Sequence, residues 1–153
     1  MRKAGRTAIK KRDLLISALI VLATVLFLWN FRFVRVVGES MEPTLSAGQW
    51  LLTTTHTSEL NRNDIVVFRQ EDQRCVKRVM AVGGDTVRLE DGKIYINQIA
   101  CNDYRYEGEA KSYTLAENEI FVLGDNTNNS RDSRTFGPIK LEQIQFKYLF
   151  SLF

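Results

Sequence analysis

Histidine and cysteine are scarce in this sequence of 153 residues, which contains one His and two Cys. The spacing of Cys and His that binds a metal is absent, so we expect no metal site. No glycine-rich phosphate loop follows a predicted strand, and we expect no cofactor. A Ser-His-Asp triad would have to use His56, which lies in a polar stretch and is expected to be a solvated loop residue. If the chain performs acyl transfer, we therefore expect the base to be a lysine.

Positive charge is scarce once the first 13 residues are set aside. Residues 1–13 contain six Lys or Arg and one Asp, out of 21 basic and 18 acidic residues in all. The remainder therefore has 15 basic and 17 acidic residues, a net charge of −2. A nucleic-acid-binding surface needs a basic stripe on the folded part of a chain, so nucleic acid is not expected as a partner.

The longest uncharged run covers residues 14–31. As a helix, these eighteen residues would span roughly 27 Å, close to the ~30 Å hydrocarbon core of a bilayer. Trp29 lies near the end of the run, where aromatic side chains favour the interface, and the six preceding cations favour a cytoplasmic N-terminus. The sequence predicts a cytoplasmic basic tail over 1–13, a transmembrane anchor over 14–31 and an extracytoplasmic domain over 32–153. The protein would be held in the plasma (inner) membrane by a single pass.

Two other interpretations of the apolar run are less favoured. A cleaved secretory signal peptide has an apolar core of roughly 7–15 residues and a small-x-small cleavage site, whereas this run ends in Trp-Asn-Phe-Arg-Phe. A buried core helix is less favoured because the run is apolar on all sides and stands at the head of the sequence.

The remainder of the chain has the pattern of short strands rich in β-branched and aromatic residues. The predicted strands cover 33–37, 50–53, 65–68, 75–82, 86–90, 93–97, 119–123 and 145–152. Asp91-Gly92 is a two-residue hairpin turn of type I′, and residues 98–118 are expected to be a loop or a small insertion. The last strand is apolar on both faces, which fits either a membrane-facing position or a buried central one. The predicted fold is an all-β domain, mainly antiparallel and barrel-like, with one N-terminal transmembrane helix.

Lys77 has the surroundings that a lysine base requires. Such a base needs a lowered pKa, which burial in an apolar setting provides. In a strand over this segment, Cys75, Lys77 and Val79 share one side and Arg78 lies on the other. The alternative is a snorkelling surface lysine.

Ser40 is the candidate nucleophile. It follows Gly38, which permits conformations closed to other residues, and precedes Pro43, which fixes the chain. A rigid turn here would leave backbone N–H groups available for an oxyanion. An ordinary Gly-Ser turn has the same local pattern.

A third cluster covers residues 124–134 and is dense in turn formers and hydroxyl groups. It follows an apolar strand directly, a position where catalytic groups are often displayed. Asp132 and Arg134 are expected to pair and to hold the shape of the loop. The alternative is an Asn-rich surface turn.

Taken together, four segments resemble the boxes of type I signal peptidases, in order and behind an N-terminal anchor. They are the nucleophile box 38–45, the strand box 63–67, the base box 76–87 and the last box 124–134. The resemblance implies a membrane-bound serine endopeptidase that removes signal peptides from exported preproteins, with Ser40 as nucleophile and Lys77 as base. The preprotein would bind in extended form beside a strand, and membrane lipid would be the other partner.

The resemblance also implies roles for further residues. The backbone N–H of Ser40 would donate to the oxyanion, whereas many relatives add a serine hydroxyl where this chain has Gly38. Ser130 would orient the lysine amine, and Asp132 with Arg134 would form a structural ion pair. The walls of the pocket for small side chains would be Val37, Met41, Cys75 and Val76.

Two features depart from the family pattern. The region between the base box and the last box is short, so the large accessory β-domain of some relatives is expected to be absent. Relatives commonly have an aromatic or larger residue where this chain has Cys75. The thiol either widens the pocket or joins Cys101 in a disulfide, which an exported location permits.

Three other interpretations remain open at this point. The first is a dedicated maturation peptidase of the same fold, such as one that processes conjugative pilin precursors. The second is a self-cleaving repressor with a Ser-Lys dyad, which would carry a DNA-binding domain where this chain has residues 14–31. The third is a non-catalytic homologue that acts in assembly, against which the presence of both Ser40 and Lys77 argues.

Overall fold

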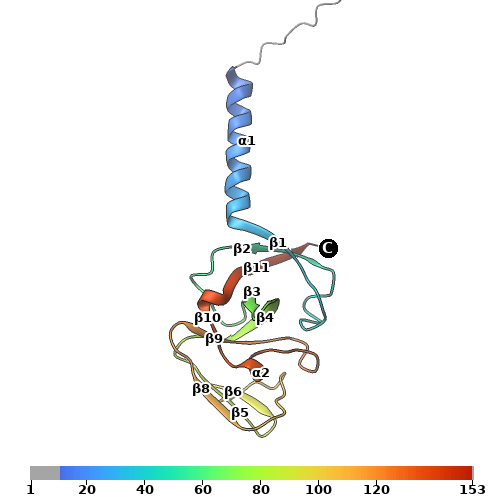
Figure 1. Cartoon of the computed structure of the whole chain (residues 1–153), viewed down its shortest axis with the longest axis vertical. Coiled ribbons are helices and arrows are strands. Elements are labelled where there is room, and N and C mark those ends of the chain that lie inside the picture. Colours follow the sequence, from blue (N-terminus) through green and yellow to red (C-terminus); the bar gives the residue numbers. More distant parts are fainter. Residues whose placement is uncertain (1–10, 153) are drawn as a thin grey trace, which may run out of the picture.

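A single long helix precedes a β-domain in the computed structural model, which describes residues 11–152. Helix α1 covers Lys11–Asn30, and none of its residues is buried. It stands clear of the domain (Figure 1), so the interpretation as a buried core helix is wrong. Its length and composition suffice to cross a membrane. Most of the basic tail predicted over residues 1–13 lies outside the described residues.

The helix passes into the sheet without a linker. Strand β1 begins at Phe31, so the end of the predicted anchor and the start of the first predicted strand each shift by one or two residues. The backbone N–H of Thr55 donates to the carbonyl oxygen of Asn30 at 2.9 Å, and the rings of Phe27 and Phe31 stack with centroids 4.9 Å apart. The last carbonyl groups of a helix lack partners within it, and here the domain supplies one.

The larger sheet has seven antiparallel strands in the order β1-β2-β11-β3-β4-β9-β10. Their bounds are β1 Phe31–Arg35, β2 Trp50–Thr54, β3 Ile65–Gln70, β4 Gln73–Ala81, β9 Glu119–Leu123, β10 Ile139–Lys140 and β11 Ile144–Leu152. A short helix α2 (Ser133–Phe136) and a 3-10 turn (Leu141–Gln143) complete this part. The prediction of a mainly antiparallel all-β domain is confirmed.

A smaller sheet lies at the end of the domain remote from α1 (Figure 1). It has the order β7-β6-β5-β8, with β5 Thr86–Glu90, β6 Lys93–Ile96, β7 Ile99–Ala100 and β8 Lys111–Thr114. Asp91 and Gly92 both have positive φ, as a type I′ turn requires. Residues 98–118 were predicted to be a loop or a small insertion, and the structure shows the second of these, because β7 and β8 fall within them. Strand β8 is mostly exposed and polar, so it carries no apolar alternation.

The last strand takes the central position that was one of the two predicted for it. It pairs with β2 and β3 and is therefore central in the sheet. Leu149 and Phe150 in its second half are nevertheless exposed, and Phe150 lies opposite Leu52, which also pairs with Phe33 of β1. Figure 1 shows β1, β2 and β11 at the end of the domain that α1 enters.

A buried acid ties the two sheets together. Asp85, between β4 and β5, accepts hydrogen bonds from Nε and Nη2 of Arg62 at 3.0 and 2.5 Å. It also accepts from the N–H of Val82 at 2.9 Å and from Nδ2 of Asn97 at 2.8 Å. Burial alone would raise the pKa of this carboxyl, but the hydrogen bonds hold it below the ordinary 3.8.

We predict that Asp85→Asn lowers the free energy of unfolding at pH 7 by about 2–3 kcal/mol, because a partly buried ion pair loses one charge. The contribution of Asp85 is present above its ordinary pKa of 3.8 and is lost as the pH falls through the lower folded value. Urea unfolding of the full chain in detergent between pH 2 and 7 measures both effects. The control is Glu90→Gln, which breaks an exposed pair with Arg88 and should change stability by less than about 1 kcal/mol. Equal losses in the two variants would contradict the role given to Asp85.

Candidate active site

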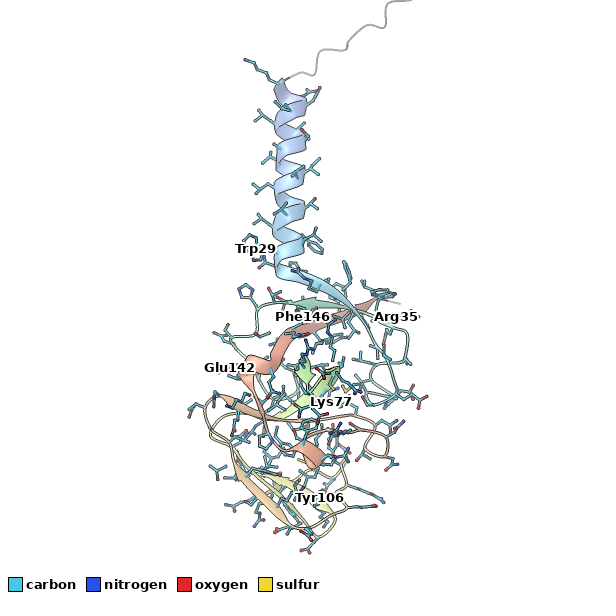
Figure 2. All side chains as sticks on the ribbon, viewed as in Figure 1. Trp29, Arg35, Lys77, Tyr106, Glu142 and Phe146 are labelled. Atoms are coloured by element: carbon cyan, nitrogen blue, oxygen red, sulfur yellow. The ribbon has the colours of Figure 1, made fainter. Side chains whose placement is uncertain are left out.

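The structure places the hydroxyl of Ser40 against the amine of Lys77. The Oγ and Nζ atoms are 2.5 Å apart, although the residues are 37 positions apart in the chain. Ser40 lies in the turn after β1, and Lys77 lies within β4, in the middle of the domain (Figure 2). A nucleophile within hydrogen-bonding distance of a base is the geometry that activates a hydroxyl.

Lys77 is buried because of the alternation along β4. Lys77 is 4% exposed and Val79 fully buried, while Val66 lies opposite Lys77 on β3 and is also fully buried. Burial lowers the pKa of Lys77 below the ordinary 10.5, and the nearby charge of Asp132 opposes this only in part. The amine is therefore more often neutral than a surface lysine and can accept a proton.

The turn that carries Ser40 is held by its neighbours in the core. Met41 and Leu45 are almost fully buried, and the N–H of Leu45 donates to the carbonyl oxygen of Met41 at 2.9 Å. Gly38 has φ +85°, a conformation that favours glycine. The predicted rigid turn is thus present.

The loop 124–134 is packed against this turn, not spread on the surface. Asp132 is fully buried and pairs with Arg134 at 2.7 Å, as predicted from the sequence. Asp132 also accepts a hydrogen bond from the backbone N–H of Gly124 at 2.9 Å. Arg134 also donates to the carbonyl oxygen of Thr127 at 2.9 Å, so this ion pair connects the end of the loop to its middle. The alternative of an Asn-rich surface turn is therefore wrong for this buried part.

Ser130 lies in the same loop, and its role stays a prediction. Its hydroxyl is buried and has no hydrogen-bond partner within residues 11–152, so the predicted bond to the Lys77 amine is not formed here. Ser130 packs closely against Gly124, where any β-carbon would overlap the Ser130 hydroxyl.

An open groove of about 820 Å³ leads to the two groups. One side is formed by residues 33–41 and the other by the β3–β4 hairpin. The four predicted pocket residues all line it, together with Ser40 and Lys77; they are Val37, Met41, Cys75 and Val76. Val37 is 91% exposed and forms part of the rim, whereas Met41 is 1% exposed and belongs to the floor.

The disulfide alternative is wrong, because both thiols are free. Cys75 packs in a cluster beneath β3 and β4, while Cys101 packs against the core of the smaller sheet. Burial raises the pKa of each thiol above its ordinary 9.0, so both are neutral near pH 7.

A second ion pair near the site was not predicted from the sequence. Arg78 donates to both oxygens of Asp125 at 2.8 and 2.6 Å, and the hydroxyl of Tyr104 donates to the same carboxylate at 3.2 Å. Burial raises the pKa of Tyr104 to about 12, so its proton is retained. Both charged residues lie in the boxes already singled out, but nothing local indicated that they would meet.

His56 is exposed, and its backbone N–H donates to the Thr54 hydroxyl at 3.1 Å. The prediction of a solvated loop residue is confirmed. A hydroxyl beside a buried amine in an open groove is an arrangement that fits a hydrolase with a serine nucleophile.

Comparison with known proteins agrees with this class. Residues 9–153 match the family described as signal peptidase, peptidase S26. The chain is 35% identical to a signal peptidase I of Bacillus amyloliquefaciens, over 75% of this chain and 74% of the relative. It is 34% identical to signal peptidase I S of Bacillus subtilis (strain 168), over 86% and 84%. A crystal structure of a signal peptidase I from Enterococcus faecalis V583 is 27% identical, covers 61% of this chain and 98% of that chain, and has a TM-score of 0.48.

The chain belongs to the signal peptidase family, peptidase S26, and is a serine endopeptidase. Its N-terminal apolar helix fits a membrane-anchored member of that family.

We predict that kcat/KM for peptide hydrolysis rises with pH through the pKa of Lys77, which burial places below 10.5. Labelling the lysines biosynthetically with ¹³C at Cε and following their NMR signals with pH reads this pKa in the chemically unmodified protein. The Lys77 signal is assigned by its absence in Lys77→Ala. A Lys77 signal that titrates at 10.5 or above would contradict this assignment of the base.

Proposed function

We propose that this chain removes N-terminal signal peptides from exported preproteins, with Ser40 as nucleophile and Lys77 as general base. The observation that carries the proposal is the 2.5 Å distance between the buried amine of Lys77 and the hydroxyl of Ser40. Both residues line an open groove. The names of the similar proteins, signal peptidase I, support the same substrate class.

The reaction proceeds through an acyl-enzyme. Ser40 Oγ attacks the carbonyl carbon of the scissile bond while Lys77 Nζ takes the hydroxyl proton. The carbonyl oxygen becomes an oxyanion that accepts the backbone N–H of Ser40. The C–N bond then breaks, and Lys77 returns the proton to the leaving amine of the mature protein. A water molecule, deprotonated by Lys77, hydrolyses the ester and frees the signal peptide.

One edge of β4 supports binding of the substrate in an extended form. Residues 73–77 pair with β3 on one side, while β9 pairs only with the later part of the strand, from Arg78 onward. Within residues 11–152, the other edge of 73–77 therefore faces the groove and offers backbone groups to an added strand. Cys75 and Val76 line the groove at this point, and a small substrate side chain fits between them and Met41.

The helix and the end of the sheet support a membrane location. On the charge pattern, residues 1–13 are cytoplasmic and the domain 32–153 is extracytoplasmic, with one pass of α1 through the plasma membrane. Phe33, Trp50 and Phe150 are about half exposed. They belong to β1, β2 and β11, which lie at the end of the domain that α1 enters (Figure 1), where lipid is a favourable neighbour. Retention of α1 is supported by its join to β1, because the hydrogen bond from Thr55 fixes its last residue to the domain.

We predict that Ser40→Ala and Lys77→Ala each reduce cleavage of a preprotein by at least about 10³-fold, because each removes one reacting group. The control, His56→Ala, should retain activity within about twofold, since an exposed side chain remote from the reacting groups contributes little. The assay incubates the purified full chain in detergent with a preprotein and determines the mass of the new N-terminus. Activity in Lys77→Ala together with loss in His56→Ala would refute the dyad.

A further inference from the structure

One residue of the loop 124–134 holds two consecutive carbonyl groups at the nucleophile. The backbone N–H of Asn126 donates to the carbonyl oxygen of Ser40 at 3.1 Å. The side-chain Nδ2 of the same residue donates to the carbonyl oxygen of Glu39 at 3.1 Å. Asn126 is therefore bound to the peptide groups on both sides of the Ser40 α-carbon.

The bond to Glu39 determines the direction of the Ser40 N–H. The C=O of Glu39 and the N–H of Ser40 belong to one planar trans peptide group, in which they point in opposite directions. Because Asn126 draws the carbonyl oxygen toward the loop, the N–H is turned away from the loop. Within the described residues this N–H has no acceptor, and Ser40 lines the groove where an oxyanion would form. A hydrogen bond to the carbonyl also polarises the peptide and strengthens donation from its N–H.

The Ser40 N–H matters more for stabilising the oxyanion here because position 38 is a glycine. Gly38 has no side chain to supply a second donor, and an added β-carbon there would meet nothing within 4 Å. Removal of one oxyanion donor commonly costs about 10²–10³ in kcat. The orientation of the remaining donor is therefore a sensitive point of the site.

Asn126 is itself held from both sides. The preceding residue, Asp125, forms the bidentate ion pair with Arg78. The N–H of Asn129 donates to the carbonyl oxygen of Asn126 at 3.1 Å, which closes a turn. The side chain of Asn129 also donates to the carboxylate of Glu39 at 3.3 Å. The side-chain amide of Asn126, which contacts the Glu39 carbonyl, is thus attached to a backbone segment held by several hydrogen bonds.

We propose that Asn126 is a positioning residue that fixes the Glu39–Ser40 peptide so that the Ser40 N–H donates to the oxyanion. This rests on the proposed function, since it concerns the same hydrolysis at Ser40. Asn126 itself touches neither the substrate nor the Lys77 amine.

The test compares Asn126→Ala and Asn126→Asp with the wild type, as full chains in detergent. The aspartate has the same size but presents an oxygen to the Glu39 carbonyl, and both variants keep the backbone bond to Ser40. We expect kcat to fall by on the order of 10- to 100-fold, less than for complete loss of an oxyanion donor. We expect KM to change by less than about threefold, and the pH midpoint set by Lys77 to stay in place.

Two inhibitors separate orientation of the donor from general damage. A peptide aldehyde adds the Ser40 hydroxyl to its carbonyl and places an oxygen in the oxyanion position, whereas the matching peptide alcohol only occupies the groove. The aldehyde should lose affinity in proportion to the loss of kcat, and the alcohol should not. The matched control is Asn128→Ala, an exposed asparagine of the same loop, which should leave kcat within about twofold.

Two kinds of result overturn the inference. Wild-type kcat in Asn126→Ala and Asn126→Asp would show that the amide has no positioning role. Parallel loss of affinity for aldehyde and alcohol, or a shifted pH midpoint, would show a structural effect instead. If Asn126→Ala melts at the assay temperature, the isosteric Asn126→Asp decides alone. Failure of the wild type to cleave any preprotein would refute the proposed function, which is a separate result.

Discussion

The site depends on the free energy of keeping one amine out of water. Desolvation of the Lys77 ammonium disfavours its charged form, and no ion pair within residues 11–152 compensates it. The charge of Asp132 acts in the opposite direction and raises the pKa of Lys77. Arg134, which pairs with Asp132 at 2.7 Å, lowers the pKa of Lys77 and so opposes that effect, while Asp132 caps α2 and holds the loop.

On the other face of β4, a second acid of the loop is likewise paired with an arginine. Arg78 follows Lys77 directly but points away from it, and its charge is matched by Asp125. Asp125 and Asp132 of one loop are therefore each paired with an arginine. Within the part of the chain that the structure describes, Lys77 is left without an acidic partner and contacts the hydroxyl of Ser40. These ion pairs also explain how an Asn-rich loop stays ordered, since both of its ends are fixed at partly buried guanidinium groups.

Sequence reasoning identified what depends on local pattern. The alternation along β4 predicted the burial of Lys77, the Asp91-Gly92 pair predicted the hairpin, and the short spacing of Asp132 and Arg134 predicted their ion pair. It missed β8, whose polar residues show no alternation. It also gave no partner to Arg78 and no role to Asn126, because those contacts join segments 47 and 87 residues apart in sequence. Only the packed sheet brings such segments together.

The direct join between helix and sheet adds a constraint on the substrate. On the proposed topology, the chain leaves the membrane at Asn30 and enters paired strand at Phe31, with no flexible segment between them. From Phe31 to Ser40 an extended chain covers at most about 30 Å, and its pairing with β2 fixes the direction. On that topology the groove would stand at a set height over the bilayer. A signal peptide whose apolar segment ends in the same membrane would have to present its cleavage site at that height, so the anchor would restrict which bonds reach Ser40.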